Sequence, residues 1–159
     1  MDIKSLIGSI QKAGKTKRTI EFSCPYIKDF FVSITYANKM VLQEIRDASR
    51  EVRFDPRTRE RQEELNEGKL QEQYATKLVA GWKGLTPRNL RKLIPGLAVK
   101  EADLDTSIPY SKDVAMAIFD SSLEFTAWVD STATTIENYS VVEKKQTKEL
   151  ENLDSLPNG

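Results

Sequence analysis

The sequence contains no histidine and only one cysteine among its 159 residues. Without histidine, the Ser-His-Asp and Cys-His types of nucleophilic catalysis are excluded, and the usual imidazole metal ligands are missing. Cys24 alone forms no internal disulfide and no thiolate cluster for zinc, which is typical of proteins from a reducing compartment. An enzyme would have to rely on carboxylates, Lys or Tyr. We therefore predict a protein that is not an enzyme and that holds no metal or cofactor.

The sequence also lacks a net charge and a long apolar run. Lys plus Arg number 24, as do Asp plus Glu, so the overall charge favours neither nucleic acid nor anionic lipid as a partner. Residues 1–13 contain no continuous apolar h-region, and no later segment approaches the ~20 apolar residues that span a bilayer. We expect no membrane association and a protein that stays in the cytoplasm in which it is made.

The patterns divide the chain into three parts, residues 1–18, 19–140 and 141–159. The first part places four apolar residues at helical spacing ahead of a basic segment: Ile3, Leu6, Ile7 and Ile10. This predicts an amphipathic N-terminal helix on a mobile linker, which either packs on its own domain or serves as a partner-binding arm. The polar third part is expected to be a disordered tail.

A β-hairpin is predicted at the start of the second part. Apolar and polar residues alternate in two runs, whose inward positions are Ile20, Phe22 and Cys24, and then Phe30, Val32, Ile34 and Tyr36. The connection 25–29 carries Pro and Asp residues that suit a turn. Because an isolated hairpin is only marginally stable, its apolar face must pack on helices or on a second copy.

The segment 38–52 is predicted to be a helix, capped by Asn38 and stopped by Asp55-Pro56. The charged stretch 57–73 is expected to be a solvated helix, an exposed loop or both. Its arginines alternate with acidic residues and lack aromatic stacking partners, so we expect no nucleic-acid binding there.

Three further helices are predicted downstream. They are a helix from Gln71 that carries Trp82 and stops at Gly84, a short helix that begins at Thr86-Pro87, and the longest helix, capped by Ser111 and continuing to about Ile136. The predicted fold class is mainly α: a small helical domain with an N-terminal β-hairpin and flexible termini.

Acidic side chains crowd residues 101–130, where paired carboxylates would be suited to Mg²⁺. Asp103 and Asp105, however, lack the central Gly and the terminal Glu of a calcium loop. We interpret these residues as a solvated, helix-capping face.

The apolar face of the helices supplies the expected partner surface. Some of its side chains should line the core, and others should contact a partner protein or a neighbouring subunit, a division that the sequence leaves open. The candidate partner-binding residues are Tyr74, Leu78, Trp82, Phe119, Phe125 and Trp128.

Short motifs follow one another in a characteristic order. They are Phe30-Phe31-Val32-Ser33-Ile34-Thr35-Tyr36, Val79-Ala80-Gly81-Trp82-Lys83-Gly84-Leu85, Ile108-Pro109-Tyr110-Ser111, Phe125-Thr126-Ala127-Trp128-Val129 and Ile136-Glu137-Asn138-Tyr139. Over about residues 19–140, their order and spacing resemble the tail assembly chaperones of long-tailed bacteriophages. The helix at residues 3–10 is not part of this pattern.

The resemblance implies a small helical protein that binds the tape measure protein, keeps it soluble and helps the tail tube protein polymerise around it. It also implies action in the host cytoplasm and absence from the mature virion. Repeated copies would lie along the long client, so we also expect a homo-oligomer. The competing function is a structural virion component, such as a minor tail or head–tail connector protein. A DNA-binding regulator and an enzyme are less well supported by the motifs.

Overall fold

A computed structural model of the protein describes residues 1–140, so the tail predicted to be disordered, 141–159, lies outside the described residues. The elements are α1 Ile3–Gly14, β1 Thr19–Ser23, β2 Phe31–Thr35, α2 Lys39–Ser49, β3 Arg50–Phe54, β4 Arg61–Leu65, α3 Glu67–Gln73, the π-helical turn η1 Tyr74–Leu78, β5 Val79–Lys83, α4 Pro87–Leu90, the 3₁₀ turn η2 Glu101–Asp103, α5 Lys112–Ser121, α6 Leu123–Thr134 and the 3₁₀ turn η3 Ile136–Tyr139.

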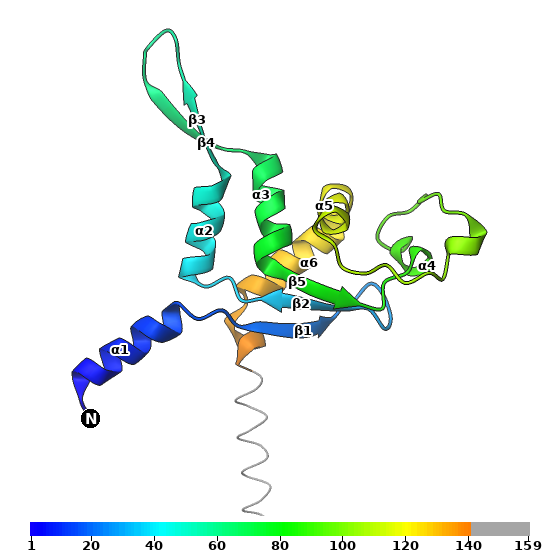
Figure 1. Cartoon of the computed structure of the whole chain (residues 1–159), viewed down its shortest axis with the longest axis horizontal. Coiled ribbons are helices and arrows are strands. Elements are labelled where there is room, and N and C mark those ends of the chain that lie inside the picture. Colours follow the sequence, from blue (N-terminus) through cyan, green and yellow to red (C-terminus); the bar gives the residue numbers. More distant parts are fainter. Residues whose placement is uncertain (141–159) are drawn as a thin grey trace, which may run out of the picture.

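An antiparallel sheet with the strand order β1-β2-β5 forms the base of the fold. Helices α2, α3, α5 and α6 lie over one of its faces (Figure 1). Val32 and Ile34 of the central strand point into this layer and are fully buried, whereas the opposite face carries Glu21 and Lys83, paired at 3.1 Å. The sheet therefore has one apolar and one solvated face, as antiparallel sheets commonly do.

The hairpin predicted for residues 20–36 is confirmed as β1 and β2, which pair in register from Thr19 opposite Thr35 to Ser23 opposite Phe31. The predicted helix starts are confirmed as well. Asn38, Thr86 and Ser111 each accept a backbone N–H of the following turn with the side chain.

The predicted fold class, mainly α with a single hairpin, is wrong. About 49% of the described residues are helical and 18% lie in strands, which form two small sheets, so the fold is mixed α and β. One cause is Val79–Lys83, which leaves the predicted helix and pairs with β2 as strand β5. Gly84 then turns at φ +84°, where a Cβ would overlap the carbonyl oxygen of Asp29.

The second cause is the hairpin of β3 and β4. It forms from the end of the predicted helix 38–52 and from the stretch 57–73, which was predicted to be a solvated helix or an exposed loop. Helix α2 ends at Ser49, whose buried Oγ donates to Ile45 O at 2.6 Å. Beyond it, the hairpin projects from the helical layer (Figure 1). It exposes Val52, Phe54 and Leu65.

The helix predicted from Ser111 to about Ile136 is interrupted. The Ser122 N–H donates to Ile118 O at 2.8 Å and ends α5, while the Ser122 Oγ accepts from Phe125 N at 3.2 Å and begins α6. A serine side chain that competes for backbone hydrogen bonds explains the break.

Tyr139 allows a test of this packing. Its buried hydroxyl donates to Ile34 O at 3.2 Å, and burial raises the pKa of this hydroxyl. Because the raised pKa means that the folded state favours the neutral phenol, stability is fully present below the unfolded pKa of about 10 and falls at higher pH. We expect Tyr139→Phe to cost about 1 kcal/mol of unfolding free energy at neutral pH. Denaturant titrations above pH 10 should show a smaller further loss in the variant than in the wild type; equal losses would contradict this.

Candidate protein-binding groove

Tyr74 lies where helix α3 changes into strand β5. The chain passes through a π-helical turn, in which the Val79 N–H donates to the carbonyl of Tyr74. The Tyr110 hydroxyl lies 2.8 Å from Ala75 O and 3.1 Å from Val79 O, so its single proton is shared between carbonyls near the start and just after the end of the turn. Ala75 and Leu78 are buried by this geometry, while Tyr74 stays half-buried at the surface of the helical layer. Such π turns are frequent at functional sites.

A hollow of about 200 Å³ opens beside Tyr74, between the π turn and helices α5 and α6. Its lining residues are Tyr74, Phe119, Leu123, Thr126, Ala127, Val129 and Asp130. Leu123, the first residue of α6, is 79% exposed. It follows the break at Ser122, so it lies at the rim. Burial, and then the charge of Asp130, raise the pKa of the Tyr74 hydroxyl above its usual range.

A second hollow of about 190 Å³ lies on the other side of Tyr74, between α2 and α3. Its lining residues are Leu42, Ile45, Arg46, Leu65, Leu70 and Tyr74. Since Tyr74 lines both hollows, we call them together the Tyr74 groove. Each is smaller than the ~300–1,000 Å³ of typical small-molecule sites, and mostly apolar. The groove is therefore suited to the side chains of a protein partner.

The structure divides the six candidate partner-binding residues. Leu78 and Phe125 are fully buried in the core. Tyr74 and Phe119 meet in the groove, although Phe119 is almost fully buried. That these residues bind a partner stays a prediction.

The two tryptophans of this set do not line either hollow. Trp82 donates from Nε1 to Ile108 O at 2.9 Å and packs edge-on against Tyr110, with ring centroids 4.9 Å apart, so it holds the connector before α5. Trp128 packs against the ring of Phe125 at 6.1 Å.

Four leucines of the groove were missed by the sequence analysis: Leu42, Leu65, Leu70 and Leu123. A signal for Leu123 is present in the sequence. Phe125 lies six positions after Phe119, whereas residues on one helix face follow each other after three or four positions, and two serines lie in this interval. Leu65 and Leu70 lie in the charged stretch, where only the tertiary fold gives them a partner.

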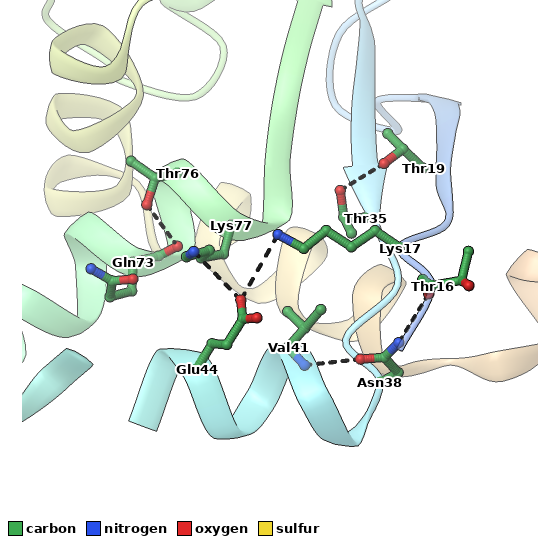
Figure 2. A network of polar contacts seen from close by, with 10 residues as sticks. All are labelled: Thr16, Lys17, Thr19, Thr35, Asn38, Val41, Glu44, Gln73, Thr76 and Lys77. Atoms are coloured by element: carbon green, nitrogen blue, oxygen red, sulfur yellow. Dashed lines mark hydrogen bonds and ion pairs between the residues drawn. The ribbon is translucent and has the colours of Figure 1, made fainter. Parts of the chain in front are cut away.

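A polar network surrounds Glu44, in the middle of α2 (Figure 2). The Glu44 carboxylate lies between Lys77 at 3.4 Å and Lys17 at 3.8 Å, and these residues line an open hollow of about 800 Å³.

Among residues 1–140, no three His, Cys, Asp or Glu side chains are placed to hold a metal ion. Within the same residues, no helix has the length and apolarity needed to cross a membrane. Cys24 is buried, and burial raises the pKa of its thiol.

Substitutions in the groove and in the core should differ in their effect on the free energy of unfolding. We expect Leu123→Ala to change the unfolding free energy by less than about 0.5 kcal/mol, because the side chain is exposed. Phe125→Ala, two residues away and fully buried, should cost about 3–5 kcal/mol. Equilibrium urea unfolding measures both; a large loss for Leu123→Ala would make it a core residue.

Comparison with known proteins gives a family. No curated protein and no solved structure matches the chain. The model of the family described as "YdaY prophage protein" matches residues 36–150, which include every residue of the Tyr74 groove and exclude α1. Since the match covers more than half of the 159 residues, the chain belongs to the YdaY prophage protein family and is of phage origin.

Proposed function

We propose that this protein is a tail assembly chaperone that binds and solubilises the tape measure protein and promotes assembly of the tail tube protein around it. It acts in the host cytoplasm without enzymatic activity and leaves before the virion matures. The phage family agrees with this function, and so does the resemblance of the motifs between residues 30 and 139.

The observation that carries the proposal is the Tyr74 groove with Leu123 at its rim. An amphipathic helix binds a groove through apolar anchors at positions such as i, i+3, i+4 and i+7. Two side-chain-sized hollows on either side of one tyrosine offer two such anchor sites. Asp130 lines one hollow and Arg46 the other, so each offers a charged group to the polar flank of the bound helix.

Co-expression with the tape measure protein of the same phage tests the proposal. The wild-type chain should keep the client soluble and co-purify with it. Leu123→Asp places a charge where an apolar anchor would lie, so the co-purified client should fall at least about tenfold. Ile136→Asp is the matched control, because Ile136 is also exposed but lies outside the groove, and it should behave like the wild type. A client that remains equally soluble with the Leu123 variant would refute binding in the groove.

A structural virion component is the second candidate, favoured by the projecting β3–β4 hairpin. Its two strands expose Val52, Phe54 and Leu65. Such a hairpin is only marginally stable when isolated, and its exposed apolar side chains are suited to burial against another protein in a permanent assembly. Mass spectrometry of purified particles distinguishes the two functions. The structural component persists in stoichiometric amounts, whereas the chaperone is absent.

A further inference from the structure

Helix α1 is an amphipathic helix that no other part of residues 1–140 covers. It buries none of its 12 residues, and Figure 1 shows it projecting away from the sheet and the helical layer. Its apolar stripe, Ile3, Leu6, Ile7 and Ile10, is 39–61% exposed. An isolated helix of this length is marginal in water, and Gly8 weakens it further. Covering the stripe would therefore stabilise the helix as well as bury apolar surface.

We define residues 1–18 as the arm. Its last residues, Thr16 and Lys17, are fixed to the domain (Figure 2). Thr16 Oγ1 donates to Lys12 O at 2.8 Å at the end of α1, and the Thr16 carbonyl accepts from Asn38 Nδ2 at 3.2 Å. Lys17 pairs with Glu44. If α1 folded back onto its own helical layer, the chain would have to bend sharply between the end of α1 at Gly14 and these contacts. A surface on another copy needs no such rearrangement.

The arm and one side of the Tyr74 groove carry opposite charges. The arm has five cationic side chains and one acidic one: Lys4, Lys12, Lys15, Lys17, Arg18 and Asp2. Helices α5 and α6 have four acidic side chains and one cationic one: Asp113, Asp120, Glu124, Asp130 and Lys112. Such complementary charges steer association and favour one orientation over others.

We propose that the arm of one copy binds the Tyr74 groove of a second copy, with apolar side chains of α1 filling the two hollows and its lysines facing the acidic surface of α5 and α6. The contact is heterologous, since two different surfaces meet. The arm would then cover the groove until a client helix displaces it; this last consequence rests on the proposed function. Self-association needs no client, so it is tested separately from chaperone activity.

Sedimentation velocity of the full-length chain over a wide range of concentration provides the test. The wild type should associate, and Ile7→Asp and Leu123→Asp should each weaken association at least about tenfold, because each places a charge in the apolar contact. Ser9→Asn is the matched control for the arm, because it adds a side chain of the same size on the polar side of α1 without changing the charge of the arm, and it should leave association unchanged. Both apolar sites are exposed, and circular dichroism checks that each variant is folded.

Mixing the two variants makes the test specific. The Leu123→Asp copy keeps an intact arm and the Ile7→Asp copy keeps an intact groove, so the mixture should form a one-to-one complex at concentrations at which each variant alone is monomeric. The inference fails if the wild type is monomeric throughout, as it would be with the arm docked on its own copy. It also fails if Ile7→Asp associates like the wild type, or if the mixture stays monomeric. A wild type that associates but does not solubilise the tape measure protein would sustain this inference and overturn the proposed function.

Discussion

The pairing of β5 with β2 is the interaction on which the rest of the structure depends. It places Val79–Lys83 beside the N-terminal hairpin and makes Phe31–Thr35 the central strand. Helix α3 must therefore give way to a strand at Val79, and the π turn accommodates this change within five residues. The same turn leaves Tyr74 at the surface between the two hollows, while the Tyr110 hydroxyl ties the turn to the segment that leads into α5. Sheet pairing thus sets the position of the groove.

Local signals in the sequence identified the elements that depend on local chemistry. The alternation of apolar and polar residues was sufficient to predict the hairpin of residues 20–36. The helix starts were predicted from the capping side chains of Asn38, Thr86 and Ser111. Both kinds of signal involve neighbours in sequence. Strand β5 was missed since Tyr74, Leu78 and Trp82 also fit helical spacing, and a short apolar run does not reveal its partner strand. The β3–β4 hairpin was missed because Val52 and Phe54 are the only alternating apolar residues among many charges, and its cross-strand ion pairs, such as Arg53 with Glu64, are non-local.

The candidate site was predicted only in part for a related reason. Tyr74 and Phe119 were selected as large apolar residues of helical faces, which is a sound signal for burial but not for location. The groove combines α2, β4, α3, the π turn, α5 and α6, and no spacing rule brings six segments together. The buried candidates, Leu78, Phe119 and Phe125, have the same local pattern as the partly buried Tyr74, Trp82 and Trp128. Only the packing of the sheet against the helices separates core from surface.

Two projecting elements, α1 and the β3–β4 hairpin, share one physical property. Each is a secondary-structure element that is marginal when isolated, and each exposes apolar side chains that a soluble monomer would normally bury. A chain with 30% charged residues and no net charge has little electrostatic repulsion between its copies, so such surfaces are free to meet. We therefore propose that the apolar groove, the amphipathic arm and the hairpin belong together, as surfaces of a protein that gains stability when it is bound to others.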